Sequence, residues 1–148
     1  MIELVPFLEL HVQVEPVIDL GSAGTARRRV VPITGGTVSG AYSGTILPGG
    51  SDWQDVLPDG SLDIAARYVL KLVDGLVEVD SRGLRHAEPQ VLARLDRGEE
   101  VAPSDYYFRT AIRLRTSSVS LSKLNSMLLV SVGERRARSV HLDVYRVT

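Results

Sequence analysis

FLELHVQVE, residues Phe7 to Glu15, alternates apolar and polar side chains from Leu8 to Glu15. Its leucines and valines occupy the even-numbered positions, while Glu9, His11 and Gln13 fall between them. Successive side chains of a β-strand point to opposite faces of a sheet. This period of two therefore predicts a strand with one face buried and the other in water.

The same alternation returns in the middle and at the end of the chain. In SLDIAARYVLKL, residues 61–72, Ile64, Ala66 and Tyr68 share a face opposite Asp63 and Arg67. SVHLDVYRV, residues 139–147, repeats the pattern. Spacers rich in Gly, Pro, Asp and Ser, which favour turns, separate further strands expected near residues 27–34, 36–47, 76–81, 106–115 and 126–133.

About eight strands are therefore expected, against one short helix near residues 88–97. In EPQVLARLDRG, Pro89 suits the first helical turn, Leu92 and Leu95 share a face with Val91, and Gly98 follows as a C-terminal stop. A shorter turn is expected from residue 120 to residue 125.

We expect one all-β domain that spans residues 1–148. Mostly antiparallel strands in this number must close into a barrel or pack as a sandwich, because a long open sheet leaves unpaired edges. We favour a single antiparallel β-barrel. An eight-stranded barrel has an interior that side chains fill or that holds one small ligand.

Composition and charge exclude several classes of function. The absence of cysteine removes disulfide frameworks, thiolate metal sites and cysteine nucleophiles. The net charge is −1, and the runs Arg27–Arg29 and Arg135–Arg136 lie among acids, so no nucleic-acid partner is expected. Neither a signal peptide nor an apolar stretch of about 20 residues is visible. We expect a cytoplasmic protein without membrane contact.

GGTVSGAYSGTILPGG, residues 35–50, is rich in glycine, and Gly36, Gly40 and Gly44 share one face of the expected strand. The segment has neither the Lys-Ser/Thr ending of a P-loop nor the GxGxxG spacing of a dinucleotide-binding fold. Glycines allow a strand to coil strongly where a barrel bends. Their missing side chains would also leave room inside for a ligand.

LPGGSDWQ, residues 47–54, combines a glycine pair with an acid, the single tryptophan and an amide. We expect a sharp turn that delivers Asp52, Trp53 and Gln54 together at the barrel mouth. If Asp52 is desolvated it is a candidate general base, since burial raises a carboxyl pKa; the alternative is an aspartate that caps the turn. Trp53 is a core or rim anchor, or a wall on which a ligand stacks, and Gln54 is a candidate ligand-binding residue.

Two arginines lie beside aromatic residues in the expected strands. Arg67 and Arg109 are out of phase with Tyr68 and Phe108, so they either point outward into surface ion pairs or line the barrel. On a lining face they would bind a carboxylate, enolate or phenolate oxygen. Tyr107, in phase with Arg109, would then donate a proton.

RGLRH, residues 82–86, supplies Arg85 as a ligand-binding candidate and His86 as an acid–base candidate. His86 precedes the helix expected near Pro89, where the helix N-terminus favours a neutral imidazole. The alternative is a structural or merely exposed histidine.

His11 and His141 fall on the polar faces of the first and last strands, which would be neighbours in a closed barrel, with Glu9 and Asp143 near them. No compact ligand spacing such as HxH or HExxH is present. We therefore expect no metal site, and no cofactor.

Six motifs follow one another along nearly the whole chain: ITGG (33–36), ILPGGSDWQ (46–54), ARYVL (66–70), RGLRH (82–86), YYFRT (106–110) and LDVYRV (142–147). Together they resemble an uncharacterised bacterial family, domain of unknown function 3237, with a lipocalin-like β-barrel fold. The resemblance implies the barrel and an oligomer, and it supplies no catalytic residues. Residues 116–124 depart most from the family pattern.

The leading hypothesis is a barrel that binds a small, oxygen-rich, partly apolar compound as a cofactor-free isomerase, lyase or cyclase. The catalytic candidates are Asp52, Tyr107 and His86, and the ligand-binding candidates are Trp53, Gln54, Arg67, Arg85 and Arg109. One alternative is a ligand carrier or sensor without chemistry. Another is an oligomeric interaction module with a side-chain-filled barrel. A homo-oligomer is expected.

Overall fold

The computed structural model describes residues 1–24 and 26–148. Within these ranges, ten strands form one antiparallel sheet, and three short helical segments join them. The strands are β1 (Leu4–Val14), β2 (Ile18–Ala23), β3 (Ala26–Gly40), β4 (Gly44–Ile46), β5 (Gly50–Val56), β6 (Leu62–Leu72), β7 (Gly75–His86), β8 (Tyr107–Arg115), β9 (Leu129–Arg135) and β10 (Ser139–Val147). The helical segments are α1 (Pro89–Asp96) and the two 3₁₀ turns η1 (Pro103–Asp105) and η2 (Val119–Ser126).

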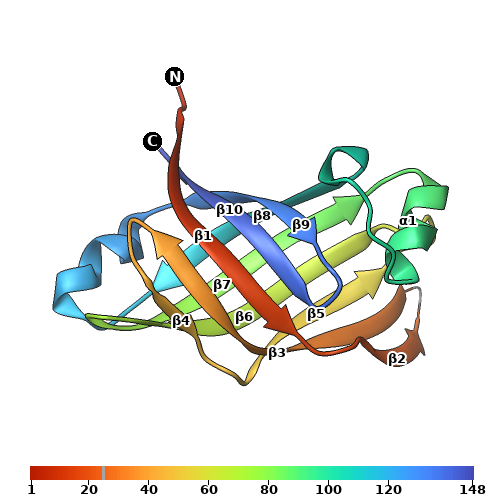
Figure 1. Ribbon diagram of the computed structural model, residues 1–148, viewed down its shortest axis with the longest axis horizontal. Helices are drawn as coiled ribbons and strands as arrows, with labels where there is room; N and C mark the ends of the chain where they lie inside the picture. Colours follow the sequence, from red (N-terminus) through yellow and green to blue (C-terminus); the bar gives the residue numbers. More distant parts are fainter. Residues whose placement is uncertain (25) are drawn as a thin grey trace.

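The sheet closes on itself because β1 pairs with both β10 and β3. From β10 the order runs through β9, β8, β7 and β6, and β4 and β5 both lie between β6 and β3. This ring of eight positions is the barrel seen in Figure 1, with β2 paired to the first part of β3. The prediction of an all-β antiparallel barrel is confirmed.

The structure differs from the expected strands around LPGGSDWQ. The strand expected at residues 36–47 is divided, because β3 runs unbroken to Gly40 and only the short β4 follows. Gly49 has a φ of 106°, which only glycine adopts readily, and it makes the turn. Strand β5 starts at Gly50, so Asp52, Trp53 and Gln54 lie within a strand and alternate between the two faces.

The glycines of β3 and β4 allow close approach of neighbouring strands. A Cβ on Gly36 would lie 2.0 Å from the His11 carbonyl oxygen of β1, and a Cβ on Gly44 would lie 2.1 Å from the Lys71 carbonyl oxygen of β6. Real Cβ atoms do not approach backbone oxygens so closely. The absent side chains are therefore accounted for by strand packing rather than by space for a ligand.

The helical segments lie at the two ends of the barrel. The helix expected near residues 88–97 is α1, which lies at the end where β5 and β7 finish (Figure 1) and buries Leu92 and Leu95. The turn expected over residues 120–125 is η2, which lies at the opposite end and buries Leu121 and Leu124. Among the described residues, no helix has the length and apolar character needed to span a membrane.

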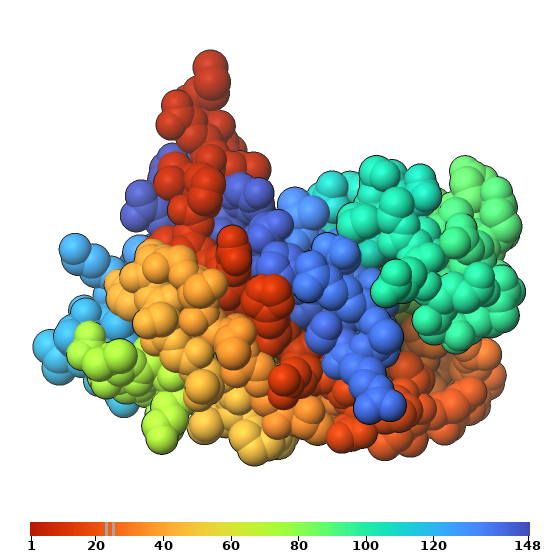
Figure 2. Space-filling model, viewed as in Figure 1, coloured from red at the N-terminus to blue at the C-terminus, as the bar shows by residue number. Residues whose placement is uncertain are grey.

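The chain ends pair beside each other outside the barrel wall. The Glu3 amide donates to the Thr148 carbonyl oxygen at 3.1 Å, and the Thr148 amide donates to the Glu3 carbonyl oxygen at 2.9 Å. Figure 2 shows the N-terminal residues projecting from the body of the molecule. The first and last strands therefore form a continuous seam that completes the ring.

Candidate functional site

The barrel holds an interior cavity of about 310 Å³ at its α1 end. This volume lies at the lower end of the range of about 300 to 1,000 Å³ that is usual for small-molecule pockets. A few polar groups interrupt a mostly apolar wall, which is the usual composition of such pockets. The apolar wall includes Val12, Val14, Val31, Ile33, Ile64, Phe108, Val140 and Leu142.

Small side chains next to Asp52 leave this space open. On the inner face, Asp52 of β5 lies opposite Ala66 of β6, and Ala66 lies opposite Ser81 of β7. The ring of Phe108 leaves no room for a side chain at Gly133 of β9, because a Cβ there would lie 2.7 Å from the ring. The side chains around Asp52 therefore do not fill the barrel interior at this level.

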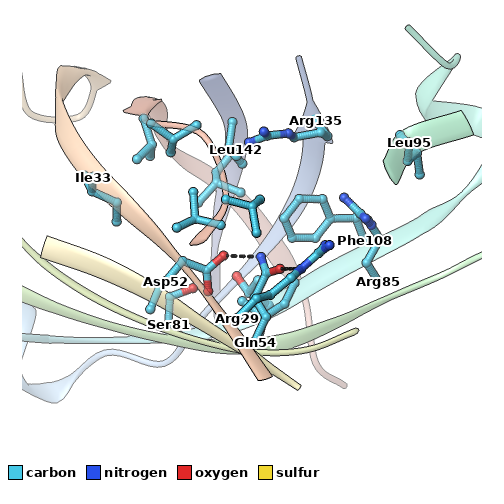
Figure 3. A pocket seen from close by; sticks show the side chains of 18 of the residues that line it. Arg29, Ile33, Asp52, Gln54, Ser81, Arg85, Leu95, Phe108, Arg135 and Leu142 are labelled. Carbon is cyan, nitrogen blue, oxygen red and sulfur yellow. Dashed lines mark hydrogen bonds between the residues drawn. The ribbon is translucent and has the colours of Figure 1, made fainter. Parts of the chain in front are cut away.

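A hydrogen-bonded chain runs from Asp52 to Arg29 inside the cavity (Figure 3). The Gln54 amide donates to Asp52 Oδ2 at 2.8 Å, and Arg29 Nε donates to Gln54 Oε1 at 2.7 Å. Gln54 and Arg29 are direct partners across β5 and β3, which places both side chains on the inner face. The chain orients one carboxylate oxygen and leaves the other free.

The second oxygen of Asp52, Oδ1, is buried without a hydrogen-bond partner in the described part of the chain. Burial raises the pKa of the Asp52 carboxyl to about 6, and the hydrogen bond from Gln54 and the charge of Arg29 oppose this rise only partly. A carboxyl with this pKa exchanges its proton near neutral pH. Asp52 lines the cavity, and its Oδ1 lies buried in the wall with acceptor capacity that no residue of the described ranges uses.

Three strand arginines bring positive charge to the cavity: Arg29 from β3, Arg85 from β7 and Arg135 from β9. A fourth lining arginine, Arg97, is exposed and forms an ion pair with Glu99. Burial is the main cause that lowers the pKa of Arg85 to about 10, and burial also lowers the pKa of Arg135. Both remain charged at neutral pH. Arg85 Nε is buried without a partner among residues 1–24 and 26–148, so it still has a donor to offer.

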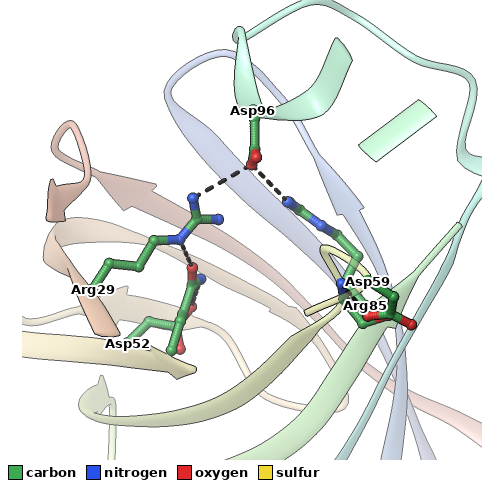
Figure 4. A network of polar contacts seen from close by, with 7 residues as sticks. Arg29, Asp52, Asp59, Arg85 and Asp96 are labelled. Atoms are coloured by element: carbon green, nitrogen blue, oxygen red, sulfur yellow. Dashed lines mark hydrogen bonds and ion pairs between the residues drawn. The ribbon is translucent and has the colours of Figure 1, made fainter. Parts of the chain in front are cut away.

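Asp96, the last residue of α1, faces two of these arginines (Figure 4). Its Oδ1 lies 3.4 Å from an Arg29 terminal nitrogen and 3.9 Å from an Arg85 terminal nitrogen. The Asp96 side chain is 43% exposed, so water weakens both ion pairs. With Asp52 ionised, three positive charges face two carboxylates, and the site favours an anion.

Tyr68 contributes a third unpaired polar atom to the cavity wall, after Asp52 Oδ1 and Arg85 Nε. Its hydroxyl is buried and has no hydrogen-bond partner within the described ranges. Burial, with a smaller contribution from the negative charge of Asp52, raises the pKa of Tyr68. The hydroxyl therefore stays protonated and is available to donate to a ligand oxygen.

Three of the residues singled out from the sequence lie together in the cavity: Asp52, Gln54 and Arg85. The open question for LPGGSDWQ was whether Asp52 and Gln54 point inward or cap a turn. Both point inward, because β5 alternates and the two residues share a phase.

The other five candidate residues do not line the cavity, because the alternation of each strand turns their side chains outward. Trp53 points outward between Asp52 and Gln54, and its side chain is 45% exposed beneath the guanidinium of Arg28. Arg67 points outward from β6 and forms an ion pair with Glu78. The alternative of surface ion pairs, rather than a lining face, therefore describes Arg67.

Tyr107 and Arg109 also lie on the outer face, where the Arg109 guanidinium lies 4.8 Å from the centre of the Tyr107 ring. Their neighbours Phe108 and Thr110 point inward instead. His86, at the end of β7, lies outside the cavity with its Nδ1 2.6 Å from the Ser61 hydroxyl. As placed, none of these three side chains reaches a ligand bound in the cavity.

Seven polar residues of the cavity lining are not among the residues predicted from the sequence: Arg29, Tyr68, Ser81, Asp96, Arg97, Thr110 and Arg135. Arg29 belongs to the arginine run at residues 27–29, yet it shares its phase with the inward-facing Val31. Tyr68 was assigned to the inner face as an apolar residue, and its hydroxyl was overlooked. For both Arg29 and Tyr68, the signal in the sequence is their spacing of two from buried apolar residues, which indicates that their side chains point inward. The position of Asp96 depends on how α1 docks, which no local pattern indicates.

The model of a family described as "Protein of unknown function (DUF3237)" matches residues 2–147. The chain belongs to this family. A UPF0311 protein of Bradyrhizobium diazoefficiens is 37% identical over 132 residues, which cover 88% of this chain and 87% of the relative. The resemblance noted from the six motifs is thus confirmed, and the family is one of uncharacterised β-barrel proteins.

Solved structures of similar chains agree with the fold. A conserved protein of unknown function from Rhodopseudomonas palustris is 33% identical with a TM-score of 0.93, over 100% of this chain and 98% of the other. A "beta-barrel like protein" from Acinetobacter baumannii is 36% identical with a TM-score of 0.86, over 100% and 97%. More distantly, a chain described as an enzyme from Penicillium herquei shares the fold at 16% identity, with a TM-score of 0.70 over 100% and 94%.

Proposed function

We propose that this DUF3237 protein binds a small anionic compound with an apolar body in its cavity and catalyses a proton transfer on it without a cofactor. The observation that carries the proposal is the Asp52 carboxylate. It lines the cavity together with Arg29, Arg85 and Arg135, burial raises its pKa to about 6, and one of its oxygens is buried without a partner in the described ranges. Groups with a perturbed pKa in a concave site are the usual candidates for acid–base chemistry.

Asp52 serves as the general base in this proposal. Its free Oδ1 takes a proton from a carbon next to a carbonyl group of the ligand, and the C–H electron pair moves to form an enolate. Gln54 holds the other oxygen of Asp52 at 2.8 Å and so fixes the direction of the lone pairs. A pKa near the working pH suits a group that must both take and return a proton.

Tyr68 and the arginines stabilise the negative charge. The Tyr68 hydroxyl donates to the developing enolate oxygen, and the unpaired Arg85 Nε donates to a carboxylate or phenolate of the ligand. Return of the proton to a different atom completes an isomerisation. Loss of a β-hydroxyl as water completes a dehydration and leaves an α,β-unsaturated carbonyl compound. Addition of a ligand hydroxyl to the β-carbon of that compound closes a ring, with the hydroxyl proton taken by Asp52 and returned to the α-carbon.

Phenylpyruvate is a suitable probe because it joins a carboxylate, an enolisable C3–H group and an apolar ring. We expect saturable binding and wild-type acceleration of C3 proton exchange in D₂O, followed by ¹H NMR. Asp52→Asn should lower the accelerated rate by about 10²- to 10⁴-fold, the usual contribution of a general base. Asp63→Asn is the matched control, since Asp63 is exposed on β6, and it should exchange at the wild-type rate.

Two outcomes would count against the proposal in different ways. Binding without accelerated exchange would favour the carrier or sensor and remove the catalytic role of Asp52. If neither phenylpyruvate nor simple aromatic and aliphatic carboxylates bind, the anionic ligand class is wrong. The 310 Å³ cavity already argues against a barrel filled by its own side chains, as a pure interaction module would have.

A further inference from the structure

Two histidines meet on the outer wall of the barrel, where its first and last strands pair. His11 of β1 and His141 of β10 are direct cross-strand partners. Their rings lie edge to face with centroids 4.2 Å apart, and the two Nδ1 atoms are 3.2 Å apart. The two strands cross the face turned to the viewer in Figures 1 and 2. Residues 130 positions apart in the chain thus make one cluster.

Asp143 selects the tautomer of His141. Its Oδ1 lies 3.0 Å from His141 Nε2, and an ionised carboxylate only accepts hydrogen bonds, so Nε2 carries the proton. In the neutral ring, Nδ1 then presents a lone pair toward His11. A histidine that donates one ring N–H to a carboxylate while its other nitrogen faces a cation is the usual arrangement around protein-bound zinc.

The spacing of the ligand atoms suits a small cation. Two nitrogens bound tetrahedrally to zinc at about 2.0 to 2.1 Å lie about 3.3 Å apart, close to the separation of the two Nδ1 atoms. Glu9 joins the two histidines, since one ligand atom from each of Glu9, His11 and His141 lies within 4.8 Å of the others. Glu9 is exposed, so its side chain is free to rotate toward the ion.

We propose that His11, His141 and Glu9 bind a divalent cation of the zinc class, with Asp143 orienting His141. Two imidazoles and one carboxylate leave a fourth position for water. The expectation of no metal rested on the absence of a compact ligand motif. That reason fails here, because barrel closure brings together ligands that lie far apart in the chain.

The bound cation would fasten the seam of the barrel. It would hold β1 to β10 from the outside, while Val12 and Leu142 of the same strands line the cavity from the inside. Because the unfolded chain does not present this site, binding free energy adds to folding free energy. The site is separate from the proposed catalytic residues, so either proposal can fail without the other.

Isothermal titration of tag-free protein with ZnCl₂ tests the site. We expect one zinc per chain and a zinc-dependent rise in Tm. His11→Ala and His141→Ala should each weaken binding by at least about 10-fold and remove the rise in Tm, and Asp143→Asn should weaken binding by about 10- to 100-fold. His86→Ala is the matched control, since His86 is the remaining histidine of three and lies at the end of β7, and it should bind like wild type.

Far-UV circular dichroism verifies the fold of each variant. Glu9→Gln and Asp143→Asn preserve side-chain size, so the zinc affinity of these two variants tests the site without a change in packing. No zinc binding by wild type would overturn the proposal. Wild-type affinity in both His11→Ala and His141→Ala would overturn it too, as would loss of binding in His86→Ala alone.

Discussion

At the scale of single residues, two of the three unpaired polar atoms in the described part of the cavity wall, Asp52 Oδ1 and the Tyr68 hydroxyl, are of opposite kind. Asp52 Oδ1 accepts hydrogen bonds, and the protonated Tyr68 hydroxyl donates one. A buried polar atom without a partner costs roughly 1 to 3 kcal/mol, so a fold that retains both gives up stability for groups that a ligand would satisfy. Active sites commonly contain groups that lower the stability of the fold in this way.

Tyr68→Phe separates function from stability at this position. We expect unfolding free energy equal to wild type or up to about 1 kcal/mol higher, because the variant removes a buried hydroxyl that has no partner. The same variant should slow phenylpyruvate exchange by about 10-fold or more, because the enolate oxygen loses a donor. Urea unfolding and the NMR exchange assay measure the two effects. A marked loss of stability would instead indicate that the hydroxyl is bonded in the folded protein.

The sequence located Asp52 and Gln54 but not their surroundings. Both were recognised because a polar pair followed two glycines, which is a local signal. The sequence leaves Arg67 and Arg109 open between an outward and a lining position, because a period of two defines two faces without saying which of them is buried. Burial of the neighbouring Ala66, Tyr68 and Phe108 decides that question.

At the scale of elements, the end of α1 supplies a carboxylate where an anionic ligand would bind. Asp96 lies 3.4 Å from Arg29 and 3.9 Å from Arg85. Asp96→Asn removes this competing negative charge. We expect phenylpyruvate to bind the variant several-fold more tightly, and isothermal titration would measure the change. Weaker binding would mean that Asp96 positions the arginines rather than competing for them.

A substitution in strand β4 tests whether its glycine is needed for close approach of the neighbouring strand. Gly44→Ala would place a Cβ 2.1 Å from the Lys71 carbonyl oxygen, so β4 and β6 must separate. We expect a loss of about 1 to 3 kcal/mol in unfolding free energy, as for other overpacked sites. Thr45→Val, at the next and exposed position, should remain within about 0.5 kcal/mol of wild type. Equal stability of both variants would contradict the packing role of Gly44.

Elements with a strong period were predicted well, and short paired segments were not. β1, β6, β10 and α1 follow from alternation or from helix signals within a few residues. β2 and β5 were missed because their sequences, IDLGSA and GSDWQDV, carry turn-forming and polar residues. Pairing with the long strand β3 holds both in place, and this tertiary contact outweighs local preference.

At the scale of the whole molecule, burial of Asp52 links stability to pH. The folded pKa of about 6 exceeds the usual 3.8, so between these values the native state binds more protons than the unfolded chain. The contribution of Asp52 to the free energy of unfolding is therefore complete below pH 3.8 and decreases as the pH rises toward 6. The decline amounts to about 3 kcal/mol. Asp52→Asn does not titrate and lacks the decline.

Urea unfolding of wild type and Asp52→Asn at several pH values isolates this effect. The difference between their unfolding free energies should shift in favour of the variant as pH rises through the window, and level off above it. A difference independent of pH would mean that Asp52 titrates alike in the folded and unfolded states.

The closed barrel was predictable as a whole because alternation in about eight segments permits few solutions. The cavity was not. Its existence depends on which small residues, such as Ala66 and Ser81, lie side by side across the barrel, and that depends on strand register. The meeting of His11 and His141 has the same origin.

Every step of the proposed chemistry requires Asp52 to lie in a dry cavity and to exchange its proton near neutral pH. The most direct test is a ¹³C NMR titration of the Asp52 carboxyl carbon, assigned by comparison with Asp52→Asn. We predict a midpoint at about pH 6. A midpoint near the usual 3.8 would show a solvated carboxylate and would contradict the role of Asp52 as the base.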